Sequence, residues 1–205
     1  MSGFAIGVDL GGTNLRIAAV DDSGKLLEKV TTGTKVSLGR AHVITEMCDA
    51  IRTLAGKFSL DSELLGVGIG VPGIIDKRTV MLRESPNLPG WHDYPVRDEI
   101  ERRLQAPVVL ENDANAAALG ENWLGAAKGF DDMLMITLGT GVGGGMVLRQ
   151  KVWHGMTGMA GELGHITVDP NGPKCGCGNQ GCVEQFASAS AVVRMARAAI
   201  ESGKA

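Results

Sequence analysis

Two stretches decide the fold: Val8-Asp9-Leu10-Gly11-Gly12-Thr13 and Thr137-Leu138-Gly139-Thr140-Gly141-Val142. In each, an apolar strand pattern ends in a glycine turn that contains a Gly-Thr pair, and a second apolar run follows. A P-loop or a Rossmann fingerprint would place a helix after the turn, so neither motif fits. The repeated strand–turn–strand unit indicates a duplicated framework in which each half presents a glycine hairpin.

Outward from these hairpins, strand and helix patterns alternate, which indicates an α/β fold. Apolar residues at helical spacing predict helices over 41–57, 96–105, 113–124 and 188–202. Apolar runs predict strands over 4–10, 15–20, 25–32, 64–71, 108–110, 133–138 and 145–149. Loops and turns are expected over 81–95, 139–145 and 155–181.

The repeat also predicts two domains, a small N-terminal α/β domain over 1–115 and the start of a large α/β domain over 116–205. The second half has its opening strands and one helix, but fewer elements than the first. Because a duplicated fold should continue, we expect the second domain to be incomplete.

Composition argues against several classes of function. Hydrophobic residues make up 44% of the 205 residues, which is enough to fill a core. The net charge is −3 and the sequence has no Lys/Arg cluster, which argues against a nucleic-acid partner. No apolar run approaches the ~18 residues that span a bilayer, and the start of the chain lacks a signal-peptide pattern. We therefore expect a cytoplasmic protein without a membrane partner, in which cysteines stay reduced.

The first glycine hairpin has the chemistry of a phosphate-binding turn. Gly11 and Gly12 let backbone N–H groups approach an anion, and Thr13 and Asn14 add side-chain donors. Asp9 precedes the turn, where its carboxylate could hold Mg²⁺ directly or through water. The alternative is an ordinary hairpin turn, and the second Gly-Thr copy favours phosphate binding over it.

A second candidate site is Glu111-Asn112-Asp113-Ala114-Asn115, where a buried strand gives way to an Ala-rich helix. Open α/β sheets place ligands at such junctions. A carboxylate here, favoured in its ionised form by the helix N-terminus, can accept the proton of a sugar hydroxyl during phosphoryl transfer. The alternative is that Asp113 only caps the helix, and the polar neighbours Asn112 and Asn115 favour a functional role.

Three of the four cysteines, Cys175, Cys177 and Cys182, lie close together downstream of His165. Three thiolates and one imidazole form the closed tetrahedral shell of a structural Zn²⁺ site, and free reduced cysteines are the alternative. This loop has few apolar residues, so a metal would fix its shape. The rival fourth ligands are His42, His92 and His154.

Carboxylates flank this cluster, because Glu162 precedes His165 by three residues and Glu184 follows Cys182 by two. Carboxylates and amides in a pocket suit polyhydroxylated ligands, since each hydroxyl can donate to one group and accept from another. The alternative is two exposed glutamates without a role. Asn87 lies in a rigid loop beside Trp91, for which core packing is the expected role.

Together these motifs resemble the ROK family (repressor, open reading frame, kinase), and within it the bacterial glucokinases. The resemblance covers nearly the whole chain, and the set of motifs is specific although any single glycine motif would be weak. It rests on residues 9–14, 72–73, 86–91, 111–115, 138–145, 161–165 and 175–184.

The resemblance implies an actin-like ATPase fold, of the ribonuclease H-like type, with two domains closing over a cleft. It implies ATP-dependent phosphorylation of a hexose at the 6-hydroxyl, with glucose as the expected sugar and Asp113 as the general base. The implied sugar contacts are Gly73, Asn87, Asn112, Asp113, Glu162, His165 and Glu184. The implied contacts to ATP and Mg²⁺ are Asp9, Gly11, Gly12, Thr13, Asn14, Thr140, Gly141, Gly143 and Gly144. The implied Zn²⁺ ligands are His165, Cys175, Cys177 and Cys182.

Alternatives to a glucose kinase stay open. A single epimeric hydroxyl cannot be read from sequence, so kinases of N-acetylmannosamine, fructose or allose are the runners-up. The family also contains sugar-responsive transcriptional repressors, which carry an added N-terminal helix-turn-helix domain, whereas this sequence starts at the first strand. The resemblance further implies a homodimer or homotetramer. It also implies that family chains continue beyond residue 205, so we expect the 205-residue chain to be weakly active or inactive alone.

Overall fold

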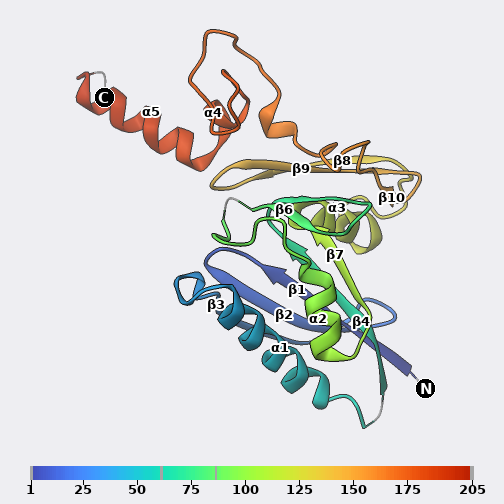
Figure 1. The fold of residues 1–205 in the computed structure, drawn as a ribbon. Helices are drawn as coiled ribbons and strands as arrows, with labels where there is room; N and C mark the ends of the chain where they lie inside the picture. Colours follow the sequence, from blue (N-terminus) through green and yellow to red (C-terminus); the bar gives the residue numbers. More distant parts are fainter. Residues whose placement is uncertain (1, 61, 86, 204–205) are drawn as a thin grey trace. The chain divides into compact units, whose positions relative to one another are not determined.

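The computed structural model describes residues 2–60, 62–85 and 87–203 (Figure 1). Pro86, part of one motif quoted above, lies outside these residues. Contacts divide the chain into two units, the first ending at Ala116 and the second starting at Ala117. Within the described ranges, each helix is too short or too polar to cross a membrane.

The first unit is built on a five-stranded mixed sheet in the order β3-β2-β1-β4-β7. Its strands are β1 (Ser2–Leu10), β2 (Asn14–Asp21), β3 (Leu26–Gly33), β4 (Ser62–Val71) and β7 (Val108–Asn112). The first three strands pair antiparallel, and β4 pairs parallel with both β1 and β7. The predicted glycine hairpin between β1 and β2 is thereby confirmed.

Two helices pack on one face of this sheet, α1 (Arg40–Gly56) and α2 (Val96–Leu104), with the 3-10 turn η1 (Val36–Leu38) before α1. Alternate residues of β1, from Phe4 to Leu10, are buried against the apolar stripe of α1, as period-2 and period-3.6 patterns require. Trp91 is buried in the same core and meets the Tyr94 ring edge-on at 6.2 Å, so its predicted packing role is confirmed.

The loop predicted over 81–95 contains a short strand that the sequence did not indicate. β5 (Ile74–Ile75) and β6 (Leu82–Glu84) form a two-stranded antiparallel sheet. The close approach depends on Gly73, where φ is 125° and an added Cβ would lie 2.0 Å from the Glu84 carbonyl oxygen. Strands of two and three residues are too short to show a period-2 pattern, so the sequence could not predict this pairing.

The second unit contains a three-stranded antiparallel sheet in the order β10-β9-β8. Its strands are β8 (Met133–Leu138), β9 (Val142–Leu148) and β10 (Lys151–Val152). The helices are α3 (Asp113–Leu124), which begins in the first unit, the 3-10 turn η2 (Leu163–His165), α4 (Glu184–Ala187) and α5 (Ala189–Glu201).

The second glycine turn is shorter than predicted, because β9 begins at Val142 and not at Gly145. Gly143, Gly144 and Gly145 pair in register with residues of β8. An added Cβ on Gly144 would lie 2.6 Å from Leu163 Cδ1 and 2.9 Å from the Gly161 carbonyl oxygen. The low strand preference of glycine is overridden here because the segment around η2 packs directly on the strand backbone.

Candidate active site and metal cluster

The first glycine turn is held by a residue that sequence reasoning missed. The Gly11 amide donates to the Asn14 carbonyl at 2.9 Å, which closes the turn. Thr34 is buried, its hydroxyl donates to the Gly11 carbonyl at 2.6 Å, and its amide donates to the Thr13 carbonyl at 3.0 Å. Two carbonyl oxygens of the turn are therefore occupied by Thr34, which lies just beyond β3.

Gly12 and Asn87 meet in the first unit. An added Cβ on Gly12 would lie 2.8 Å from the Asn87 carbonyl oxygen and 3.2 Å from its Cβ. The predicted sugar-binding loop therefore packs directly on the predicted phosphate-binding turn, and only glycine leaves room for it. The side chains of Thr13, Asn14 and Asn87 are exposed and free to meet a ligand.

Asp9, the predicted Mg²⁺ residue, forms an ion pair across the hairpin. Asp9 and Arg16 are register partners on β1 and β2, and Arg16 Nη1 lies 2.7 Å from Asp9 Oδ2. Both side chains are about half exposed. A lone cross-strand pair of this kind contributes little to stability, but it fixes the direction of the Asp9 carboxylate.

Asn112, and not Asp113, caps helix α3, which corrects one alternative drawn from the sequence. The Asn112 Oδ1 atom accepts the Asn115 amide at 3.1 Å, the hydrogen bond of an N-cap residue to position N3. Asp113 is the first helical residue and accepts the amide of Ala114 at 2.9 Å. The capping requirement of the helix is thus met without Asp113.

Asp113 is protonated more readily than an exposed aspartate. Burial raises the pKa of its carboxyl, the Ala114 amide opposes this, and the negative charge of Asp9 adds to the rise. The backbone amides at the helix N-terminus favour the ionised form, as expected, but desolvation outweighs them. A raised pKa makes the carboxylate a stronger proton acceptor.

A polar network fixes the residues on either side of Asp113. Glu111 pairs with Lys77 at 2.8 Å, and its other oxygen accepts the Asn112 amide at 2.9 Å and Asn115 Nδ2 at 3.3 Å. Asn112 Nδ2 donates to the Gly73 carbonyl at 3.2 Å. Gly73, Asn112 and Asp113, three predicted sugar contacts, are therefore neighbours in the first unit. Sequence reasoning did not identify Lys77.

The second glycine turn lies in the second unit between β8 and β9. The Gly139 amide donates to the Gly141 carbonyl at 3.0 Å, and Thr140 is exposed at the tip. Of the glycines predicted to bind ATP, Gly141 lies in the turn, whereas Gly143 and Gly144 lie inside β9. Gly144 is buried under η2, so its visible role is close packing.

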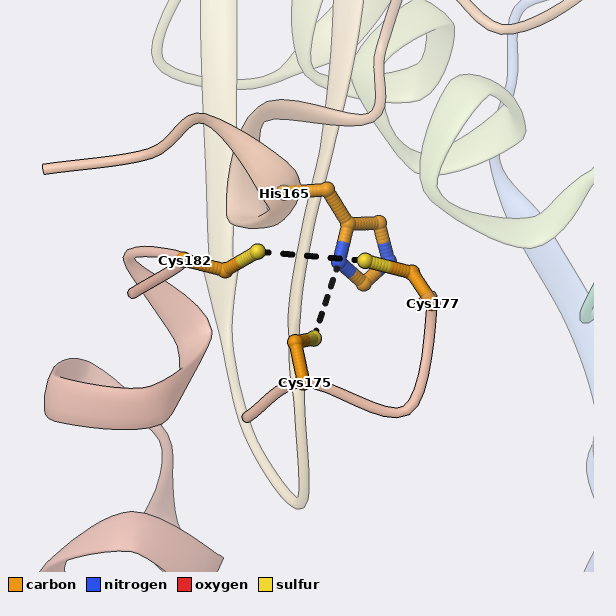
Figure 2. A group of neighbouring side chains, drawn as sticks. All are labelled: His165, Cys175, Cys177 and Cys182. Atoms are coloured by element: carbon orange, nitrogen blue, oxygen red, sulfur yellow. Dashed lines mark hydrogen bonds between the residues drawn. The ribbon is translucent and has the colours of Figure 1, made fainter. Parts of the chain in front are cut away.

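The cysteine cluster is assembled around His165 (Figure 2). The ligand atoms of His165, Cys175, Cys177 and Cys182 all lie within 4.8 Å of one another, so among the histidines His165 is the partner of the three thiols. Cys177 Sγ and Cys182 Sγ are 3.8 Å apart, and Cys175 Sγ is 3.6 Å from His165 Nδ1. In a tetrahedral Zn²⁺ site the S–S and S–N edges are about 3.8 and about 3.6 Å, so the residues fit such an ion.

The thiols influence one another strongly. Burial alone would raise the pKa of Cys175, but hydrogen bonds from the backbone and thiol of Cys177, from Cys182 and from His165 lower it to about 7. Burial, together with the neighbouring Cys175 and Cys177, raises the pKa of Cys182 to about 12. Three thiolates this close repel one another, and a bound cation removes that repulsion.

Glu162 and Glu184 occupy different positions relative to the cluster. Glu162 Oε2 lies 3.7 Å from His165 Nε2, so His165 faces the thiols with one ring nitrogen and Glu162 with the other. Glu184 Oε2 accepts the Val142 amide at 3.0 Å, beside the second glycine turn. Glu184 is thereby engaged with the protein backbone, a contact that the sequence did not suggest.

Comparison with known proteins identifies the family. Residues 5–204 match the ROK family. A glucokinase from Thermotoga maritima is 46% identical over 192 residues, which cover 94% of this chain but 59% of that protein. The crystal structure of a ROK family glucokinase from Streptomyces griseus, in complex with glucose and AMPPNP, gives a TM-score of 0.78 at 42% identity. It covers 98% of this chain and 62% of that one.

The sheet order, the glycine turns and this structural likeness define an α/β protein with the actin-like ATPase fold. The chain belongs to the ROK family. It spans about 60% of the length of the glucokinases it matches. A putative xylose repressor from Caldicellulosiruptor is also similar, with 34% identity over 98% of this chain and 50% of that protein. Glucokinases and a putative xylose repressor are thus both among the relatives of this chain.

Proposed function

We propose that the protein containing this sequence transfers the terminal phosphoryl group of ATP to the 6-hydroxyl of a hexose, with glucose as the preferred sugar. The similarity to glucokinases supports the substrate class. The observation that carries the proposal is Asp113, a partly buried carboxylate at a strand–helix junction. Asn112 caps helix α3 in its place, and burial raises the pKa of the Asp113 carboxyl.

In this proposal Asp113 accepts the proton of the sugar hydroxyl as that oxygen attacks phosphorus. Asn87, Asn112, Glu162, His165 and Glu184 would hold the other hydroxyls, with the Gly73 backbone beside them. The two glycine turns would hold the phosphates of ATP, Asp9 would face Mg²⁺, and bound Mg²⁺ would neutralise charge on the phosphates. Phosphoryl transfer needs little from the protein beyond positioning and charge stabilisation, which these groups can supply.

We also propose that the four-ligand cluster binds Zn²⁺ as a structural ion. The distances among the ligand atoms fit a tetrahedral shell, and all four ligands come from the protein, as in a closed structural site. His165 would then join the metal to Glu162 and to the sugar. All four cysteines are free, which accords with the reducing cytoplasm that we propose as the location.

The test of the kinase proposal is the substitution Asp113→Asn. Phosphorylation of glucose is followed in a coupled assay that detects glucose 6-phosphate. It is run on the 205-residue chain and on a chimera that continues it with the C-terminal part of the Thermotoga maritima glucokinase. We expect a weak or absent rate for the 205-residue chain and a measurable one for the chimera.

In the chimera, Asp113→Asn should lower kcat by about 100-fold or more while the KM for glucose changes by less than about threefold. Asp49→Asn is the matched control, because Asp49 is exposed on α1 and its ion pair is with solvent-exposed Arg52. It should leave both constants unchanged. An Asp113→Asn variant that keeps its turnover, or loses sugar affinity as much as rate, would contradict the role of Asp113.

The choice of sugar needs its own measurement. Allose differs from glucose in one epimeric hydroxyl, N-acetylmannosamine in the group and configuration at C2, and fructose in the position of its carbonyl, and each of them carries a 6-hydroxyl that could be phosphorylated. A panel of these sugars on the chimera, compared by kcat/KM, assigns the substrate. We expect glucose to give the highest kcat/KM. A tenfold preference for another hexose would make that hexose the substrate in place of glucose.

A sugar-binding repressor module is the second candidate, because a xylose repressor relative matches nearly the whole chain. A repressor would bind sugar without phosphorylating it. Sugar binding in calorimetry, combined with no ATP consumption by the chimera and a sequence-specific gel shift by the natural protein, would favour this candidate. Light scattering on the same samples tests the proposed dimer or tetramer.

A further inference from the structure

The metal cluster and the second glycine turn are connected through one residue, Val142. Val142 is the first residue of β9 and directly follows the turn. Its amide donates to Glu184 Oε2 at 3.0 Å, and Glu184 lies two residues beyond the cluster member Cys182. The Val142 amide is thus bound to the segment that carries a cluster cysteine.

The carbonyl side of Val142 meets the other half of the cluster. An added Cβ on Gly164 would lie 2.0 Å from the Val142 carbonyl oxygen and 2.9 Å from its carbonyl carbon. Gly164 immediately precedes the cluster member His165 on η2. The segments that carry His165 and Cys182 therefore touch Val142 at its carbonyl and at its amide.

The same two segments are joined to each other away from Val142. The Val183 amide donates to the Ile166 carbonyl at 2.9 Å, and Thr167 and Cys182 form an isolated β-bridge. These are backbone contacts between short loop segments, which are weak without a covering core. An ion bound to His165 and Cys182 would join the segments directly.

The turn itself is fixed by the helices that follow the cluster. The Ala189 amide donates to the Gly139 carbonyl at 2.8 Å, and the Ser190 hydroxyl donates to the Thr140 carbonyl at 2.8 Å. An added Cβ on Gly141 would lie 2.4 Å from Glu184 Oε2, so glycine at 141 is what lets the carboxylate reach Val142. Every turn residue from Gly139 to Gly141 is therefore in contact with residues 184–190.

We propose that the His165/Cys175/Cys177/Cys182 cluster, when it holds Zn²⁺, braces the glycine turn 139–141, and that Glu184 is the positioning residue that connects them. The bound metal would hold in place the two segments that contact Val142. The hydrogen bond from the Val142 amide to Glu184 would then hold the end of the turn against them. The turn conformation then depends on metal occupancy. The consequence for phosphate affinity rests on the kinase proposal, whereas the brace itself does not.

The brace is tested by amide hydrogen exchange on the 205-residue chain, with and without Zn²⁺, the metal content being measured in each sample. Zn²⁺ removal by a chelator should raise exchange in residues 139–143 about tenfold or more, the scale of one lost charge-assisted hydrogen bond. Glu184→Ala should give the same rise with Zn²⁺ still bound, and chelation should add little to it. Glu184→Gln, which keeps an acceptor for the Val142 amide, should retain most of the protection.

Gln185→Ala is the matched control, since Gln185 is the next residue of α4 and its side chain makes no hydrogen bond among those described for the turn. It should exchange like the wild type. The proposal is overturned if Glu184→Ala keeps wild-type exchange at full metal content, or if the chain binds no Zn²⁺. If chelation unfolds the whole second unit, the Zn²⁺-bound Glu184→Ala sample still gives the decisive result.

A second readout separates the brace from the kinase proposal. Binding of inorganic tripolyphosphate, measured by calorimetry on the Zn²⁺-loaded chain, should weaken at least fivefold in Glu184→Ala and stay unchanged in Gln185→Ala. A wild-type chain that binds no tripolyphosphate would overturn the phosphate role of the turn. The exchange measurement would still decide whether metal occupancy controls the turn.

Discussion

The ion pair between Lys77 and Glu111 should stabilise the first unit more than an ordinary surface pair does. The two side chains are 32% and 17% exposed, and their charged atoms are 2.8 Å apart. Exposed pairs contribute about 0–1 kcal/mol, whereas removing one partner of a fully buried pair costs about 3–5 kcal/mol. This pair lies between the two cases, because solvent around the partly exposed Lys77 screens the attraction. We therefore expect Lys77→Met to lower the free energy of unfolding by about 1–2 kcal/mol.

Glu111→Ala should cost more than Lys77→Met, because Glu111 also accepts the Asn112 amide and Asn115 Nδ2. Each buried donor left without a partner costs about 1–3 kcal/mol, so about 2–6 kcal/mol is expected for the two donors together. Lys35→Met is the matched control. Lys35 pairs with Glu46 at 2.7 Å, but the side chains are 50% and 33% exposed. Its removal should cost no more than about 0.5 kcal/mol.

Urea unfolding followed by tryptophan fluorescence can measure these differences in the correct unit. Trp91 is fully buried in the first unit, whereas Trp123 and Trp153 are about half exposed in the second. Replacing Trp123 and Trp153 by Phe leaves Trp91 as the reporter of the first unit. The reasoning fails if Lys77→Met destabilises this unit no more than Lys35→Met, because burial would then give the pair no added strength.

Three further predictions concern the sites themselves. Gly12→Ala should weaken tripolyphosphate binding tenfold or more in calorimetry, because its Cβ would lie 2.8 Å from the Asn87 carbonyl oxygen; unchanged affinity would contradict this close packing. Asp113→Asn should raise stability at pH 7, because the pKa of Asp113 is higher in the folded state than in the unfolded state and its ionisation therefore opposes folding. The gain should vanish as pH falls below the unfolded pKa of about 3.9. Urea titrations at pH 7 and pH 3.5 measure both effects, and an equal gain at the two pH values would contradict the raised pKa. Gly164→Ala should destabilise the second unit by about 1–3 kcal/mol through the clash with Val142, read from fluorescence of that unit, and a neutral effect would contradict the contact.

Local patterns in the sequence were sufficient to predict most of the secondary structure. The hairpin around Gly11-Gly12, helix α1 and the strand that ends at Val71 follow from turn chemistry and from periodicities of 2 and 3.6. The β5–β6 pair was missed because its strands of two and three residues are too short to show a period-2 pattern. The start of β9 was misplaced because glycine is a poor strand former, and packing against Leu163 overrides that preference.

The candidate residues were predictable by type, but their supporting contacts were not. The cluster of His165 with three cysteines could be predicted because metal ligands leave a spacing pattern in the sequence. Lys77 and Arg16 could not be identified, since a charged residue beside a turn usually lies on a solvated surface. The cap of α3 could not be assigned from the sequence because Asn112 and Asp113 are both good N-cap residues, and only geometry separates them.

The two glycine turns share a device that the sequence repeat does not contain. In the first unit the Thr34 hydroxyl donates to the Gly11 carbonyl at 2.6 Å, and in the second the Ser190 hydroxyl donates to the Thr140 carbonyl at 2.8 Å. A carbonyl oxygen that pointed at a bound phosphate would repel it, so a turn that binds anions must hold its carbonyls elsewhere. A hydroxyl donor fixed by neighbouring structure does this in both units. The donors lie 23 and 50 residues from their acceptors, so separate parts of each half meet the same requirement. This accords with our proposal that both turns bind phosphate, because the requirement then comes from the ligand and not from the repeat.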